Sequence, residues 1–519
     1  MHHFKNQSRR LFLRQASAMS ALVGSAAAPF ALNLAALGSA AAQSQSDYRA
    51  LVCLFFFGGN DSFNMVLPTD AASWSAYQTT RNQAPDPIAL RAVGTLADGM
   101  AAVASPARLG GVLPITPINA QGRAYALHPL LASLQTLFNT DRRLAVLPNI
   151  GPLILPTSKA QYATANHPRP ARLFSHNDQQ NTWQALGPEG TTLGWGGRMG
   201  DMFAAQNARP AFTAISATGN AVWLAGDQVR QYQVNTTGAI PLGVDSAGRV
   251  FGSATVGASL QRLAASVRSG HPFDADLAAV ARRAIDAEQI LRTALRPPGD
   301  PAFGTTPATG NYIANNDPKL RYDNPLTAAQ APNTLAQQLQ VVARLIDAGL
   351  RGTSGTRRQV FFVSVGGFDT HDLQNRNQAD LMARVAHALQ YFDTTLGGLG
   401  ARNNVTTFSA SDFGRTFTSN GDGTDHGWGS HHLVMGGAVR GGDLYGRFPT
   451  LSVKNSNNNN FDGSPDQLGN GSLLPTTSVD QLGATLGRWM GLSDAQTLDI
   501  FPNLASFDAS TRNLGFLGA

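Results

Sequence analysis

The stretch that decides the fold is VFFVSVGGFDTH, residues 360–371. It opens with a short, mostly β-branched or aromatic apolar run and stops at Gly366-Gly367, after which come Asp369 and His371. An apolar run of this length predicts a buried strand, and the two glycines predict its abrupt end. In open α/β sheets, ligands bind beyond the carboxyl ends of the strands. Because carboxylates and imidazoles are common ligands of divalent metals, the stretch predicts a metal site at a strand end.

Two other stretches repeat this order of apolar run, glycine and acid. Residues 50–57 are almost continuously apolar and lead into Gly58-Gly59-Asn60-Asp61-Ser62. Residues 405–408 precede Ser411-Asp412-Phe413-Gly414-Arg415, and Gly423-Thr424-Asp425-His426-Gly427 follows shortly after. One Asp beside a glycine usually only marks a turn. Three such motifs favour a metal or anion site, with ordinary turn chemistry as the alternative.

Helical patterns separate the predicted strands. Residues 335–350, 380–399 and 478–490 have helical periodicity, with Ser478 as an N-cap, and residues 256–296 predict a helical hairpin broken at Gly270-His271-Pro272. Alternating strands and helices predict an α/β fold with a mostly parallel central sheet flanked by helices. Since the acidic motifs come from both ends of the chain, we expect one domain over residues 43–519. Its predicted loop insertions are residues 296–325 and 455–470; a division into two domains is the alternative.

Composition excludes several classes of protein. The 519 residues carry a formal charge of +6, but four of the 39 basic residues lie in the first 42 positions, which hold no acid. The rest of the chain has 35 basic against 33 acidic residues, so nothing indicates nucleic-acid binding, which usually requires a clustered basic face. The single cysteine, Cys53, lies in an apolar run and predicts a buried core thiol, with no intrachain disulfide.

The N-terminus predicts export. Ser8-Arg9-Arg10-Leu11-Phe12-Leu13-Arg14 is a twin-arginine signal, and an alanine-rich apolar stretch follows to Ala42. We expect cleavage before Gln43; a membrane anchor is the alternative, although Pro29 interrupts the run. No other stretch reaches the roughly 18 apolar residues of a membrane helix. The expected mature protein is therefore periplasmic or secreted, exported folded by the twin-arginine translocase, with no membrane span after cleavage.

The motifs together resemble a known family. They are the Asp61, Asp369, Asp412 and Asp425-His426 stretches quoted above and the late Thr476-Thr477-Ser478-Val479-Asp480-Gln481. The chain resembles the bacterial exported family called domain of unknown function 1501, over essentially the whole mature chain. That family is similar to the alkaline phosphatase and sulfatase superfamily. The resemblance implies an alkaline-phosphatase-like α/β fold, a binuclear metal site and hydrolysis of phosphate or sulfate esters.

The resemblance also implies roles for individual residues. Asp369, His371 and His426 would hold one metal, and Asp61 and Asp412 a second, with Ser62 beside it as nucleophile. A capping turn serine is the alternative for Ser62. Arg415 or His176 would steady a transferring anion. Asp425 would either bind the metal or orient His426.

One departure from the superfamily affects the second site. The superfamily usually has histidine after the second aspartate, where this chain has Phe413. A site without that imidazole suits a harder cation, so we expect one or two divalent ions among Zn, Mn, Ca and Mg. The expected function is an exported, metal-dependent hydrolase acting on a small anionic ester. The alternative is a non-catalytic exported binding or assembly protein that retains a degenerate site.

Overall fold

The central strand of the fold is β1 (Arg49–Phe57), which is buried along almost its whole length. The computed structural model describes residues 48–245, 247–458 and 460–518. Successive β1 side chains point to opposite faces of the sheet, as strand geometry requires. Val52 and Leu54 belong to one hydrophobic core, and Leu51 and Phe55 to a second. A strand covered on both faces explains why its sequence is continuously apolar.

Among the described residues, nine strands form one mixed, mostly parallel sheet in the order β14-β5-β13-β12-β1-β11-β6-β7-β8. Strand β1 pairs in parallel with β11 on one side and with β12 on the other. Strand β13 pairs antiparallel with both β12 and β5. The remaining strands of the sheet are β5 (Leu144–Gly151), β6 (Ala214–Ser216), β7 (Tyr232–Asn235), β8 (Gly238–Ala239), β11 (Arg358–Gly366), β12 (Val405–Ser411), β13 (Ser430–Gly436) and β14 (Thr477–Ser478).

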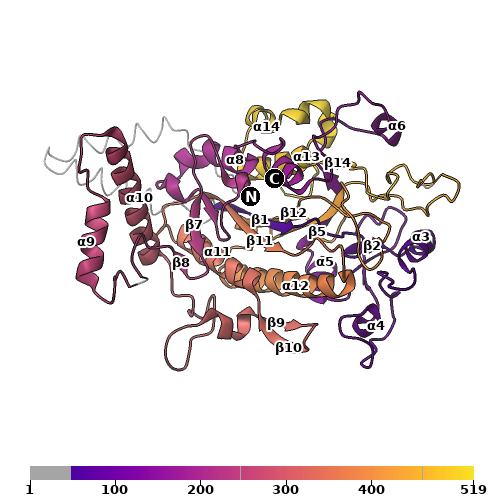
Figure 1. Ribbon diagram of the computed structural model, residues 1–519, viewed down its shortest axis with the longest axis horizontal. Coiled ribbons are helices and arrows are strands. Elements are labelled where there is room, and N and C mark those ends of the chain that lie inside the picture. The colour runs from indigo at the N-terminus through magenta and orange to yellow at the C-terminus, as the bar shows by residue number, and fades with distance from the viewer. Residues whose placement is uncertain (1–47, 246, 459, 519) are drawn as a thin grey trace, which may run out of the picture. The chain divides into compact units, whose positions relative to one another are not determined.

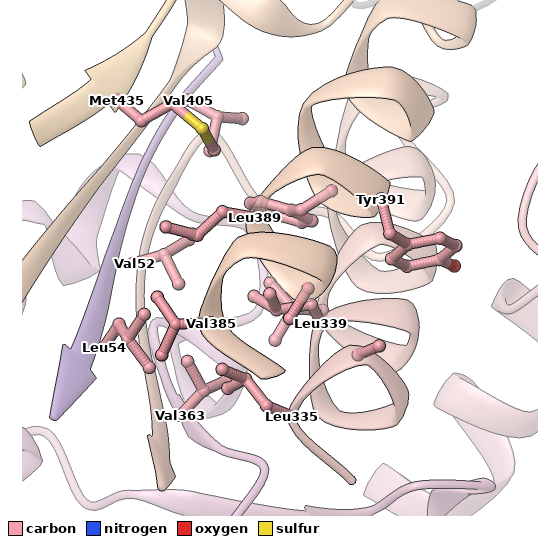
Figure 2. Close-up of a cluster of buried hydrophobic side chains, with 14 of the residues drawn as sticks. Val52, Leu54, Leu335, Leu339, Val363, Val385, Leu389, Tyr391, Val405 and Met435 are labelled. Carbon is pink, nitrogen blue, oxygen red and sulfur yellow. The ribbon is translucent and has the colours of Figure 1, made fainter. Parts of the chain in front are cut away.

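Two long helices cover one face of the sheet. They are α11 (Thr334–Leu350) and α12 (Gln374–Gly398), which lie side by side below the strands in Figure 1. Figure 2 shows Leu335 and Leu339 of α11 and Val385 of α12 pointing toward Val52 and Val363 of the strands. This contact builds the larger hydrophobic core, because each helix turns one apolar stripe to the sheet.

The opposite face is covered by helices from two parts of the chain (Figure 1). Trp195 on α8 packs against Phe408 of β12, with ring centroids 5.6 Å apart. The capping box of α13, formed by Ser478 and Gln481, fixes where that helix begins. The helices of this layer are α7 (His176–Ala185), α8 (Trp195–Phe203), α13 (Val479–Met490) and α14 (Asp494–Ile500).

Smaller elements lie around this core. Three short strands form a separate sheet, two others form a hairpin, and α9 and α10 form a helical hairpin at one end of the view in Figure 1. These elements are β2 (Val66–Pro68), β3 (Leu113–Ile115), β4 (Tyr125–Leu127), β9 (Arg321–Asn324), β10 (Ala329–Pro332), α3 (Ala71–Arg81), α4 (Pro106–Leu109), α5 (Ala132–Asn139), α6 (Lys159–Tyr162), α9 (Ala254–Ala264) and α10 (Pro272–Ala294).

The structure confirms the predicted α/β class and the strands and helices that flank the acidic motifs. Before β5, residues 125–127 form β4, and α5 starts at Ala132, after Pro129. Among the described residues, no helix has the length and apolarity needed to cross a membrane. The predicted export segment, residues 1–42, lies outside the described residues.

Candidate metal centre

The predicted acidic motifs meet at one edge of the sheet. Strands β11, β1 and β12 are adjacent and parallel, so the turns after their carboxyl ends lie next to one another. The turn after β1 passes very close to Asp369: a Cβ on Gly58, which has φ +111°, would lie 2.5 Å from the Asp369 nitrogen. Only glycine fits such a backbone. The glycines therefore allow the strand ends to converge.

Three ligand atoms form a nearly equilateral triangle at this edge. His371 Nε2 lies 3.0 Å from Asp369 Oδ1 and 3.0 Å from His426 Nε2. His426 Nε2 lies 3.3 Å from the same Asp369 oxygen. Donor atoms about 2.0–2.1 Å from a tetrahedral metal lie about 3.3 Å from one another. The three atoms thus have the spacing of one face of a metal coordination sphere.

His176 joins this group from the first turn of α7. Its Nε2 lies 3.3 Å from Asp369 Oδ2, and its Nδ1 lies 2.7 Å from Asp412 Oδ2. One atom each from His176, Asp369 and His426 can be chosen so that all lie within 4.8 Å of one another. The hydrogen bond to Asp412 raises the pKa of His176 above its ordinary value, and the charges of Asp412 and Asp369 add to that effect against partial burial.

The hydrogen bonds of the imidazoles test whether a cation fits this group. His426 Nδ1 lies 2.7 Å from the Phe174 carbonyl, so it is the donor and leaves a lone pair on Nε2. His371 Nδ1 faces Asp425 Oδ1 at 3.4 Å, which favours the same tautomer. His426 Nε2 can then accept a hydrogen bond from His371 Nε2 or, with the His371 proton on Nδ1, both nitrogens can bind a cation together with the Asp369 oxygen. Two nitrogens and an oxygen suit Zn²⁺ or a related divalent ion.

Asp369 is held by a buried arginine. Arg415 Nη1 donates to Asp369 Oδ1 at 2.5 Å, and Arg415 Nε donates to the Thr424 hydroxyl. Burial would raise the pKa of Asp369, but the hydrogen bond and charge of Arg415, together with the charges of His371 and His176, lower it below its ordinary value. Arg415 is fully buried, so it is situated to orient this carboxylate; the predicted contact with a substrate anion stays a prediction.

Asp412 lies beneath the site and contacts His176. Its carboxylate is fully buried, and Oδ2 accepts hydrogen bonds from Gln180 Nε2 at 2.8 Å and the Gly58 nitrogen at 3.1 Å, besides facing His176. Among the described residues, Asp412 Oδ1 has no hydrogen-bond partner. Carboxylates that bind the outer nitrogen of a histidine fix the ring's orientation beside a metal.

Asp61 and Ser62 are both buried, unlike the exposed carboxylate of Asp369. The Asp61 carboxylate accepts from Arg81 Nη1 at 2.6 Å and Nη2 at 3.1 Å, and from Gln374 Nε2 at 2.5 Å. Ser62 is 1% exposed, and its hydroxyl has no partner among the described residues. The Asp61 carboxylate is thus bound by Arg81 and Gln374, and its role beside Asp412 as a second pair of metal ligands stays a prediction.

Other histidines that the sequence brings near the motif lie in the core. His431 and His432 on β13 are buried, with His431 accepting from the Asn149 nitrogen and His432 packing edge-on against Trp183. Burial lowers the pKa of both to about 3. They are structural residues, because neither ring is accessible.

Sequence reasoning missed three contributors to the site. They are the Phe174 carbonyl, the Gln180 amide and the Gly58 nitrogen, which hold His426 and Asp412 in place. Neither a backbone carbonyl nor an amide carries a sequence signal. The Phe174 backbone has φ +73°, unusual for a residue with a side chain, and only the structure reveals it.

Comparison with known proteins agrees with the resemblance of the motifs. A search of curated proteins finds no match to this chain. Residues 48–501 match the family described as "Protein of unknown function (DUF1501)". This match spans most of the chain, from β1 through α14, and includes every residue of the candidate metal centre. The chain therefore belongs to the DUF1501 family.

Proposed function

We propose that this protein is an exported, metal-dependent hydrolase of phosphate or sulfate esters, with an alkaline-phosphatase-like site reduced to one metal. The observation that carries the proposal is the triangle of Asp369 Oδ1, His371 Nε2 and His426 Nε2, with edges of 3.0, 3.0 and 3.3 Å. These three residues would hold the ion, which would supply positive charge beside the oxygens of a bound ester. Export by the twin-arginine pathway is part of the proposal and rests on the N-terminal motif.

The accessible part of the site supports a reaction on a small anion. The side chains of Asp369 and His371 are each 40% exposed and that of His176 is 30% exposed, so a substrate from solvent can reach them. His176 holds Nδ1 against Asp412 and turns Nε2 toward Asp369. We assign to His176 the proton that the leaving ester oxygen takes up when its bond to phosphorus or sulfur breaks.

Water is the attacking group in this proposal, because Ser62 is buried. Water attacks phosphorus or sulfur, the ester oxygen leaves with the proton from His176 Nε2, and the proton lost by the water restores His176. The products are the inorganic anion and an alcohol. In this proposal Arg415 acts by holding Asp369.

The decisive experiment compares metal content and hydrolysis in matched variants. Elemental analysis of the purified protein should give about one equivalent of Zn or Mn, lost in His371→Ala and His426→Ala and retained in the control His271→Ala, whose histidine is exposed at the start of α10. His176→Gln should keep the metal while hydrolysis of an aryl phosphate or aryl sulfate falls by about 10²–10⁴. A protein that binds no Zn, Mn, Ca or Mg contradicts the proposal.

A second candidate function is metal binding without turnover, as in an assembly protein. The observation that favours it is Phe413, whose ring lies 4.8 Å from that of His176 and 4.6 Å from that of His426, on the side where the superfamily has a histidine. Metal at one equivalent without hydrolysis of either ester would support this second function.

A further inference from the structure

Helix α10 carries an apolar stripe with a strict repeat. Its members alternate in steps of four and three residues: Phe273, Leu277, Val280, Ala284, Ala287, Leu291 and Ala294. Steps of four and three are the heptad spacing of a coiled-coil seam, in which each side chain packs between side chains of a facing helix. The stripe therefore predicts a helical neighbour along its whole length.

The structure covers only half of this stripe. Ala287, Leu291 and Ala294 are buried in the main hydrophobic core. Phe273, Leu277 and Val280 are 77%, 68% and 53% exposed. The neighbouring helix α9 has a second exposed stripe of the same spacing, Val256, Leu260 and Leu263. In Figure 1 the two helices lie at one end of the view, beyond β7 and β8. Large apolar side chains that are exposed along one face of a helix mark a candidate interaction site.

We propose that this surface binds a second copy of the same chain, with the two α10 helices antiparallel across a two-fold axis. The name "α10 seam" is used here for Phe273, Leu277, Val280 and Ala284. Antiparallel pairing about the middle of the seam sets Leu277 opposite Val280 of the second copy. It also sets Phe273 opposite Ala284, so that a large side chain meets a small one on both sides of the axis.

The charges beside the seam favour this occupant over an unrelated helix. Asp276 and Arg283 are both exposed, seven residues apart, and occupy the same heptad position next to the seam. In the antiparallel pair, Asp276 of each copy faces Arg283 of the other, which gives two ion pairs of opposite charge. Flanking charges of this type set the choice and orientation of partner in coiled coils. A self-complementary patch is what a two-fold dimer requires.

Charge reversal and rescue test the proposal. Sedimentation equilibrium of the purified protein should show a concentration-dependent dimer of the 54.7 kDa chain. Asp276→Arg and Arg283→Asp should each weaken the dimer about tenfold or more, because like charges then face each other twice. The double variant Asp276→Arg/Arg283→Asp should recover the dimer, since the pairs re-form with their signs exchanged. Leu277→Glu should abolish it.

Controls keep the result independent of folding and of the metal centre. Asp286→Arg places the same reversal at an exposed position outside the seam and should leave the dimer unchanged. At a concentration where wild type is monomeric, all variants should keep the thermal midpoint of wild type, because the substituted side chains are solvent-exposed in the monomer. The proposal is overturned by a wild-type monomer at every concentration, by a Leu277→Glu dimer, or by failure of the double variant to recover. Wild-type monomer that binds anionic lipid vesicles would assign the surface to a membrane instead.

Discussion

Two aspartates in similar sequence motifs have opposite environments in this molecule. Asp61 follows Gly58-Gly59 after β1, and Asp369 follows Gly366-Gly367 after the neighbouring strand β11. Asp61 is 1% exposed and paired with Arg81, whereas the Asp369 side chain is 40% exposed and surrounded by imidazoles. A motif thus predicts where a carboxylate lies along a sheet edge. The partners of the carboxylate decide whether that carboxylate stabilises the fold or remains available to a ligand.

The same contrast holds for histidine. His431 and His432 are enclosed by aromatic side chains, and burial lowers their pKa to about 3. His176 lies at the open edge, where the hydrogen bond to Asp412 raises its pKa. We call the buried groups Asp61, Arg81, His128, His431 and His432 the closed region, and the exposed groups around Asp369 and His176 the open region. Substitutions can change each region separately.

The largest expected effect is acid unfolding driven by the closed region. His128, His431 and His432 have folded pKa values of about 3, below the unfolded value of about 6.5. The unfolded state therefore binds more protons, and stability is complete above about pH 6.5 and declines as the pH falls toward 3. Two groups act in the opposite direction but are fewer: His176, whose pKa is raised by the hydrogen bond to Asp412, and Asp480, whose pKa burial raises to about 6.

Denaturant unfolding at a series of pH values measures this effect. The free energy of unfolding should fall between pH 6.5 and 5, before ordinary carboxylates titrate. The exposed His271→Gln variant should leave that slope unchanged. Stability that stays constant over this interval would show that these histidines are not enclosed.

The next largest effect is expected from the buried ion pair between Arg81 and Asp61. Arg81→Leu leaves the Asp61 carboxylate buried without its cation, which should cost about 3–5 kcal/mol of unfolding free energy. Adding Asp61→Asn to that variant should recover part of the loss, because the buried charge is then removed. Asp369→Asn, at the open edge, should change stability much less while removing bound metal. Equal losses for Arg81→Leu and Asp369→Asn would abolish the distinction between the two regions.

A smaller effect is expected where the two regions meet, at Asp412. Asp412→Asn keeps the shape of the side chain but offers His176 a neutral partner, so hydrolysis should fall about 10–100-fold. Metal content should stay near wild type, because Asp369, His371 and His426 are intact. Titration with Zn²⁺ measures metal binding, and steady-state kinetics measures the rate of hydrolysis, so the two effects can be told apart. Loss of metal in this variant would place Asp412 among the ligands.

Asp425 should have the least effect. Its side chain is 60% exposed and faces His371 Nδ1 at 3.4 Å, a long and solvent-screened contact. Asp425→Asn should weaken metal binding about tenfold or less. A complete loss of metal would instead mean that Asp425 is a direct ligand, the other role implied by the resemblance.

The sequence predicted the strands that carry the site because their signals are local. Each is an apolar run ended by glycine, and adjacent parallel strands then bring Asp369 and Asp412 to one edge of the sheet without further information. Strand β13 was missed because it begins with three polar residues, Ser430, His431 and His432, which conceal a buried strand. Its antiparallel direction puts its N-terminal end, near His426, at the edge where the parallel strands finish.

Pairings between distant side chains could not be predicted. Asp61 meets Arg81 because α3 packs beside the β1 turn, and no periodicity of α3 marks that arginine as a partner. Similarly, the resemblance implies that Asp425 either binds the metal or orients His426; the structure places it opposite His371, and the Phe174 carbonyl holds His426. Such contacts depend on the packing of loops, which single-residue patterns do not encode.

The antiparallel strand has a consequence for the order of synthesis. The candidate ligands come from α7, the β11 turn and the segment before β13, so His426 joins the others only after more than four fifths of the 519 residues have been made. A nascent or truncated chain ending before His426 can form several of the strands yet cannot complete the triangle. Occupancy of the centre would therefore report that the chain has been made at least as far as His426 and that these separate segments have folded together.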